Sequence, residues 1–234
     1  MELGGKSANV LFADADFDTA ISYASRFTGN AGQGCSLPTR LLVERSIYER
    51  AIEAIVAAAS NVVVGDPFDP NVTMGPVITS GAADRILRMV GDAVRTTAGR
   101  LVLGGERAGG DLAEGSFVMP TILVDVDPAS AIAQEEIFGP VLSVIPFDDE
   151  ADAVRIANMT SFGLAAYVQT TDMKRAWRMV QALEAGNVHV NSSGPGPLSP
   201  ATPFGGVKQS GYGRQGSRIG IDEFLNIKNV YFNV

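Results

Sequence analysis

Cysteine and histidine are almost absent from this 234-residue chain, which holds one of each, Cys35 and His189. A single cysteine cannot form an intramolecular disulfide, and the two residues together supply too few ligands for a zinc site, so we expect no metal. Basic residues are also in the minority, with 18 Lys and Arg against 26 Asp and Glu, for a net charge of −8. This balance disfavours nucleic acid as a partner and leaves small molecules or other proteins.

Long hydrophobic runs are absent too. No apolar stretch reaches the roughly 18 residues that a transmembrane helix needs, and the first residues lack a basic region followed by an apolar core. The sequence therefore predicts a cytoplasmic protein with no membrane partner. Hydrophobic residues nevertheless make up 46% of the chain, which is enough to bury a core and excludes a disordered protein.

Short apolar strands alternate with amphipathic helices along most of the chain. Strands are predicted over residues 8–12, 40–43, 101–103, 117–124, 141–147, 164–169, 187–191 and 227–234, and helices over 16–28, 46–60, from about 80, from 148 or 149 to about 159, from 172, and over 219–224. Gly186 is placed where a left-handed residue would end the helix that Asp172 begins. The alternation predicts an α/β fold, with a mostly parallel sheet covered by helices on both faces.

Three short motifs fail when their context is considered. Residues 5–7 imitate the end of a phosphate-binding loop, but the required glycine and strand do not precede them. Residues 211–216 match GxGxxG without a preceding strand, which favours a structural glycine turn. Residues 14–18 imitate the start of a calcium loop but lack its glycine and its glutamate, so helix capping is the better interpretation.

Cys35 lies in a glycine-flanked loop, GQGCS at residues 32–36, between a predicted helix and a predicted strand. A lone cysteine is often a small buried hydrophobic residue. The flanking glycines favour a reactive thiol instead, because they let a substrate approach the backbone closely, and such a thiol needs an acidic group nearby. The long loop over residues 192–216, rich in Gly, Pro and Ser, is also of a length that is more often functional.

Four motifs in order carry a resemblance to a known family. They are ELGGKS at residues 2–7, GQGC at 32–35, EEIFGPV at 135–141 and PFGGVKQSG at 203–211. Together they resemble the NAD(P)-dependent aldehyde dehydrogenase superfamily, over its catalytic domain and C-terminal segment. The resemblance implies oxidation of an aldehyde to a carboxylic acid with NAD or NADP as the cofactor.

The resemblance also implies roles for individual residues. Cys35 matches the nucleophile that forms a thiohemiacetal and then a thioester, and Glu2 matches the general base that activates the hydrolytic water. Glu136 and Phe138 match residues that contact the nicotinamide-side ribose of the cofactor. Each assignment is what the motif match implies.

Substrate contacts are implied in the same way. Phe204 matches a position that lines the aldehyde tunnel. Gly34, Ser36 and Ser193, the last within the stretch 192–195, match positions that vary with the substrate. These small or polar residues are compatible with several classes of aldehyde and identify none.

The resemblance divides the chain into a catalytic domain, residues 1–207, and an oligomerisation segment, residues 208–234. The terminal strand matches a family segment that joins a sheet with a neighbouring subunit, which implies a dimer or a tetramer. In the family, a Rossmann-type cofactor domain precedes the ELGGKS motif and supplies an asparagine to the oxyanion hole. The chain alone is therefore expected to be a weak or inactive dehydrogenase.

Two alternatives stay open at this point. One is a non-catalytic domain that keeps the fold and the association strand. The other is ester or thioester hydrolysis by Cys35 and Glu2 without a cofactor.

Overall fold

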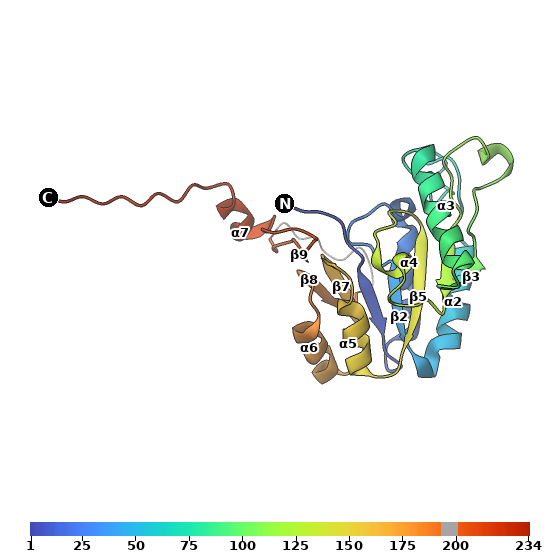
Figure 1. Cartoon of the computed structure of the whole chain (residues 1–234), viewed down its shortest axis with the longest axis horizontal. Coiled ribbons are helices and arrows are strands. Elements are labelled where there is room, and N and C mark those ends of the chain that lie inside the picture. Colours follow the sequence, from blue (N-terminus) through green and yellow to red (C-terminus); the bar gives the residue numbers. More distant parts are fainter. Residues whose placement is uncertain (193–200) are drawn as a thin grey trace.

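The structure is a computed structural model that describes residues 1–192 and 201–234. Within these residues, seven strands form one sheet in the order β3-β4-β5-β2-β1-β7-β8 (Figure 1). All neighbouring strands are parallel except β3 and β4. The strands are β1 (Ala8–Leu11), β2 (Arg40–Glu44), β3 (Arg100–Leu103), β4 (Thr121–Val124), β5 (Val141–Phe147), β7 (Ala165–Gln169) and β8 (Asn187–Val190). Two further strands, β6 (Phe162–Gly163) and β9 (Val207–Lys208), pair with each other.

Helices cover both faces of the large sheet. On one face lie α1 (Phe17–Ala24) and α2 (Tyr48–Ser60), and on the other lie α3 (Ser80–Arg95), α5 (Glu150–Asn158) and α6 (Met173–Ala182). Successive side chains of a strand point to opposite faces, so Leu41 and Val43 join the core under α1 and α2 while Leu42 joins the other core. The short helix α4 (Ala131–Gln134) joins the core on the α3 face through Ile132 and Ala133, whereas α7 (Ser217–Asp222) contributes to neither core. The predicted α/β architecture is confirmed.

Side-chain caps determine where several helices begin. Asp16, Thr79, Asp149 and Asp172 each stand just before a helix and accept a hydrogen bond from a backbone N–H of its first turn. Such caps satisfy donors that have no partner inside the helix. Asp16 is thus a capping residue, as the failed calcium-loop match suggested.

Gly186 does not have the conformation that the sequence predicts. Helix α6 ends at Ala182 and its extended C-cap is Leu183, while Gly186 is not among the residues with positive φ. A Cβ on Gly186 would lie 1.9 Å from the carbonyl oxygen of Gly205. The position excludes a side chain because another backbone crosses it, and the left-handed cap was the wrong reason for the glycine.

Several other predicted elements differ in extent. The first predicted helix ends at Ala24 and continues as the distorted 3-10 segment Ser25–Gly32, in which Asn30 and Ala31 have positive φ. The strand predicted over residues 117–124 is regular only over Thr121–Val124, after Pro120, since proline has no N–H to donate to a ladder. The last helix spans 217–222 in place of 219–224.

The C-terminal segment forms no strand within this chain. Residues 225–234 have no regular secondary structure, are exposed, and run away from the body of the molecule (Figure 1). A strand requires a neighbour to receive its backbone hydrogen bonds, and none of the described strands pairs with this segment. The strand expected over 227–234 is therefore not formed in the single chain.

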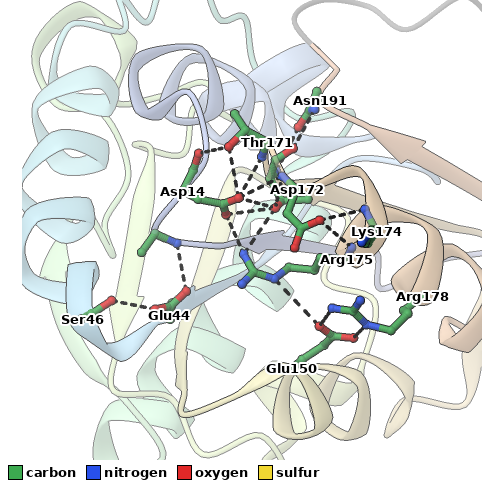
Figure 2. A network of polar contacts seen from close by, with 12 residues as sticks. Asp14, Glu44, Ser46, Glu150, Thr171, Asp172, Lys174, Arg175, Arg178 and Asn191 are labelled. Atoms are coloured by element: carbon green, nitrogen blue, oxygen red, sulfur yellow. Dashed lines mark hydrogen bonds and ion pairs between the residues drawn. The ribbon is translucent and has the colours of Figure 1, made fainter.

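Opposite ends of the parallel strands carry different groups. Glu2, Cys35 and Glu136 all lie just before β1, β2 and β5, so the topology brings them to the amino ends of adjacent strands. The carboxyl ends carry a polar network instead, centred on Asp14 in the loop after β1 (Figure 2).

The Asp14 network joins the loop after β1 to the loop after β7. The Asp14 carboxylate accepts hydrogen bonds from the hydroxyls of Thr170 and Thr171, from the backbone N–H of Asp172 and from Arg175. Figure 2 shows Arg175 between Asp14 and Glu150, which also pairs with Arg178. These internal contacts account for the polar side chains at this end of the sheet.

No helix formed by residues 1–192 or 201–234 combines the length and apolar composition needed to cross a membrane.

Candidate active site

Cys35 and Glu2 lie together at the amino ends of the two central strands. The Cys35 thiol donates a hydrogen bond to Glu2 Oε1 at an Sγ–Oε1 distance of 3.4 Å. Residues 1–7 lead into β1 and residues 33–39 lead into β2, and these strands are parallel neighbours in register Ala8 to Arg40. Two residues 33 positions apart in the sequence thus form one pair, as the motif match implied.

Burial raises the pKa of the Cys35 thiol, and the hydrogen bond and charge of Glu2 raise it further. The backbone N–H groups of Cys35 and Ser36 act in the opposite direction and lower the pKa of the thiol. The thiol is therefore protonated at neutral pH, and the group that accepts its hydrogen bond is the Glu2 carboxylate. This arrangement can produce a thiolate by local proton transfer.

Gly4 and Gly5 let two other segments approach closely: Glu136 and the loop of residues 32–36, which carries Cys35 and is called the thiol loop below. A Cβ on Gly5 would lie 2.3 Å from the Cys35 carbonyl oxygen, and one on Gly4 would lie 2.1 Å from Glu136 Oε2. The backbone N–H of Gly5 donates to Glu136 Oε1 at 3.0 Å. The motifs alone do not reveal this double packing role. The available signal was a pair of adjacent glycines two residues before a buried strand.

Gly32 joins the thiol loop to the EEIFGPV segment. Its φ is +73°, a conformation that favours glycine, and a Cβ there would lie 2.0 Å from backbone atoms of Gly139. The side chain of Gln33 accepts a hydrogen bond from the Ile78 N–H at 2.9 Å, which ties the same loop to the start of the α3 region. The motifs ELGGKS, GQGC and EEIFGPV thus contact one another, and Ser210 of the fourth motif donates its hydroxyl to the Gly4 carbonyl at 2.7 Å.

Glu136 and Phe138 each leave part of the side chain available for contact. Glu136 Oε1 is held by Gly5, whereas Oε2 accepts no hydrogen bond from the described residues. Phe138 is 41% exposed and has a φ of +52°, an uncommon conformation that surrounding structure must impose on a non-glycine residue. A fixed carboxylate with a free oxygen beside an exposed aromatic ring suits a ribose diol, so these residues fit the nicotinamide cofactor that the motifs imply.

Glu2 and Phe204 line a separate cavity of about 180 Å³. Phe204 is held by paired backbone hydrogen bonds with Gln215, both 2.8 Å long. Gly34 and Ser36 flank Cys35 directly and are partly buried. Ser193 lies outside the described residues.

The glycine-rich stretch 211–216 positions Glu2. Gly211, Gly213 and Gly216 all have positive φ, and Gly211 bridges to Glu2 in an antiparallel arrangement. The neighbouring Leu3 N–H donates to the Ser210 carbonyl at 2.9 Å. The structural turn predicted for this GxGxxG match is confirmed, because the glycines shape a loop that packs on the Glu2 segment.

Lys6 and Arg40 are fully buried below the site, and sequence reasoning missed both. Arg40 donates to the carbonyls of Lys6, Ile156 and Ala157 at 2.8–3.0 Å. Burial, and then the charge of Arg40, lower the pKa of Lys6 to about 7. No sequence pattern identifies a charged residue at the start of an apolar strand as buried, since such residues are usually exposed.

Comparisons with known proteins point to one family. The model of the aldehyde dehydrogenase family matches residues 1–230. Betaine aldehyde dehydrogenase of Cereibacter sphaeroides is 42% identical, over 99% of this chain and 47% of that protein. Mitochondrial succinate-semialdehyde dehydrogenase of Arabidopsis thaliana is 43% identical, over 98% of this chain and 43% of that protein. The chain thus spans about half the length of these relatives.

Solved structures give the same result. Indole-3-acetaldehyde dehydrogenase of P. syringae, in complex with NAD+ and IAA, superposes with a TM-score of 0.93 at 39% identity, covering 100% of this chain and 47% of that one. Betaine aldehyde dehydrogenase of Staphylococcus aureus, in complex with NAD+, gives 0.91 at 36% identity, covering 95% and 44%. From the family match, the identities and these superpositions together, we conclude that this chain belongs to the aldehyde dehydrogenase family.

Proposed function

We propose that this chain supplies the catalytic centre for oxidation of an aldehyde to a carboxylic acid with NAD(P)+, with Cys35 as nucleophile and Glu2 as general base. The observation that carries the proposal is the 3.4 Å contact between the Cys35 sulfur and the Glu2 carboxylate. Family membership supports it, because the related proteins are named as aldehyde dehydrogenases.

In the first half of the reaction, Glu2 accepts the thiol proton and the Cys35 sulfur adds to the aldehyde carbon, which gives a thiohemiacetal. Bound NAD(P)+ supplies the acceptor for the hydride that leaves this carbon. Cys35 then carries the acyl group as a thioester. Sulfur suits both steps because it is a strong nucleophile as thiolate and a good leaving group from a thioester.

Between the two halves, Glu2 releases the thiol proton to solvent and becomes a carboxylate again. In the second half, a water adds to the thioester carbonyl while Glu2 takes its proton, which then passes to the leaving Cys35 sulfur. The carbon–sulfur bond breaks, the carboxylic acid leaves and the Cys35 thiol is restored. Glu2 is exposed and borders a cavity with room for small molecules, so it can reach both the sulfur and an incoming water.

For the cofactor, we assign contact to Glu136 and Phe138. The free carboxylate oxygen of Glu136 accepts hydrogen bonds from ribose hydroxyls, and the exposed ring of Phe138 packs beside the same sugar. The NAD+ complexes of the Staphylococcus aureus relative support this cofactor class.

The direct test is NAD(P)H formation with a panel of aldehydes, measured on this chain joined to a family cofactor-binding domain. We expect Cys35→Ser to lower the rate on the order of a thousandfold or more. Ser60→Ala, a one-atom change at an exposed residue of helix α2 whose hydroxyl bonds only within that helix, serves as the matched control. Activity that survives Cys35→Ser would exclude the covalent mechanism.

A non-catalytic domain makes a different prediction for the thiol. The proposed site predicts that an alkylating reagent modifies Cys35 readily and that Glu2→Gln alters the pH profile of the modification. A merely packed cysteine reacts slowly and independently of Glu2.

Ester hydrolysis by Cys35 and Glu2 without a cofactor is tested separately. Hydrolysis of an activated ester that persists in Cys35→Ser would exclude esterase activity by this pair.

We also propose that residues 208–234 mediate self-association next to a catalytic domain that ends near residue 207. The support is the exposed apolar content of the terminal segment, in which Ile227, Tyr231 and Phe232 are each at least 80% exposed. Deletion of residues 226–234 is expected to reduce the particle mass measured by light scattering. An unchanged mass would refute the proposal.

A further inference from the structure

Tyr167, on strand β7, contacts the thiol loop through its hydroxyl. Its hydroxyl donates a hydrogen bond to the Ser36 carbonyl at 2.7 Å, across 131 positions of sequence. Ser36 directly follows Cys35, and its backbone N–H is one of the two that lower the pKa of the Cys35 thiol. The residue next to the nucleophile therefore has its carbonyl fixed by a side-chain donor from a distant strand.

The Tyr167 ring is held from two sides. Tyr23 of α1 packs against it with ring centroids 5.1 Å apart, and His189 of β8 stacks on it at 5.2 Å with an interplanar angle of 20°. Tyr167 is only 5% exposed. A ring confined in this way loses little further freedom when its hydroxyl bonds to Ser36, so the contact is pre-organised.

The titratable groups around Tyr167 keep their protonation states near neutral pH. Burial raises the pKa of Tyr167, so its hydroxyl remains a donor. Burial and the charge of Arg26 lower the pKa of His189, which is neutral above the ordinary histidine pKa. Burial also raises the pKa of Tyr23, so its ring stays neutral beside Tyr167. On the other side of the loop, the charged group that faces Cys35 is Glu2.

We propose that Tyr167 is a positioning residue for the nucleophile: its hydroxyl fixes the Ser36 backbone, and with it the position of the Cys35 sulfur relative to the backbone N–H groups that stabilise the thiolate. This inference rests on the proposed role of Cys35. It adds a residue that touches neither substrate nor cofactor and acts through the Ser36 backbone.

The test is the rate of Cys35 alkylation by iodoacetamide as a function of pH. Cys35 is the single cysteine of the chain, so the modification reports on one site. Tyr167→Phe removes the hydroxyl but keeps the ring between Tyr23 and His189. We expect alkylation on the order of threefold to tenfold slower at neutral pH, with the midpoint of the profile moved to higher pH.

Tyr48→Phe is the matched control. The Tyr48 hydroxyl accepts from the Asp125 N–H at 2.8 Å and donates to the Val144 carbonyl at 3.3 Å, and Tyr48 is 5% exposed. The Tyr48→Phe variant thus loses the hydrogen bonds of a comparably buried hydroxyl, in the core under α2 and away from Cys35. We expect an alkylation profile identical to that of the wild type.

The outcomes separate the two proposals. If Tyr167→Phe alkylates like the wild type while Cys35 remains reactive, the positioning role is overturned and the role of Cys35 stands. If wild-type Cys35 is unreactive, the proposed function fails and the positioning role with it. Equal slowing in Tyr48→Phe also overturns the inference, because a general loss of stability then explains the effect. Tyr167→Met, an apolar variant of another shape, provides the same test if the phenylalanine variant does not fold.

Discussion

Arg40 offers a sharp test of how the sheet holds the site, because it is a fully buried charge with backbone partners. It is 1% exposed, and its guanidinium donates to the carbonyls of Lys6, Ile156 and Ala157 at 2.9, 3.0 and 2.8 Å. Ile156 and Ala157 belong to the last turn of α5, where helix carbonyls lack partners within the helix. Arg40 thus joins the end of α5 to the segment that carries Glu2.

The magnitude follows from opposing effects. Each hydrogen bond from a charged donor contributes about 1.5–3 kcal/mol. Burial lowers the pKa of Arg40 to about 10, which corresponds to a desolvation cost of about 3 kcal/mol. Arg40→Met keeps most of the volume but leaves three carbonyls without this donor. We expect unfolding free energy to fall by about 3–5 kcal/mol, a large part of the 5–15 kcal/mol typical of a domain.

The assay is equilibrium urea unfolding at neutral pH, followed by far-ultraviolet circular dichroism. Arg100→Met is the control: Arg100 pairs with Asp125 at 3.0 Å, but the two side chains are 60% and 51% exposed, so the loss should stay below about 1 kcal/mol. An Arg40→Met protein within about 1 kcal/mol of the wild type, with the same denaturant dependence, would refute the argument that these bonds outweigh desolvation.

Three further predictions concern the site and the opposite end of the sheet. Gly5→Ala should slow alkylation of Cys35 and lower the unfolding free energy by about 1–3 kcal/mol, because its Cβ would lie 2.3 Å from the Cys35 carbonyl oxygen. The control is Gly91→Ala, in open space on α3, which should leave the stability in a thermal melt unchanged or raise it by up to about 1 kcal/mol. Glu2→Gln should move the pH profile of Cys35 alkylation to lower pH, because the hydrogen bond and charge of Glu2 raise the pKa of Cys35. The same variant should slow hydrolysis of an acylated Cys35 by about a hundredfold or more. An alkylation profile moved to higher pH would contradict this. Burial alone would raise the pKa of Asp14, but hydrogen bonds from the loop after β7 outweigh it and lower the pKa in the folded protein. Asp14→Asn should therefore cost about 1–2 kcal/mol at neutral pH, and the difference from wild type should vanish as the pH falls through the folded-state pKa of Asp14; a difference that persists in acid would refute the linkage.

Much of the fold was predictable because local patterns and tertiary packing agree. The apolar runs around Leu42 and Val144 are buried on both faces, as strands of a parallel sheet must be when helices cover both sides. Helix starts at Asp149 and Asp172 were readable from capping chemistry that involves only neighbouring residues. Predictions of elements were wrong where a distant or missing partner decides the structure. The C-terminal segment is an example, because no described strand lies beside it in the single chain.

The candidate site divides in the same way. Residue types and motif order were sufficient to select Cys35, Glu2 and Glu136, since nucleophilic and carboxylate chemistry depends on what the side chains are. Their convergence was decided by the parallel pairing of β1, β2 and β5, which places the ends of distant segments at one edge.

The contacts that support the site depend on tertiary structure alone. The burial of Arg40, the approach of Gly186 to Gly205 and the bond from Tyr167 to Ser36 each join segments far apart in the chain. A linear pattern reports periodicity and local propensity, but the desolvation of a charge or the direction of one hydroxyl depends on which other segment packs against it. The sequence therefore determines the layers and the reactive groups, and the packing of the sheet decides how those groups are held.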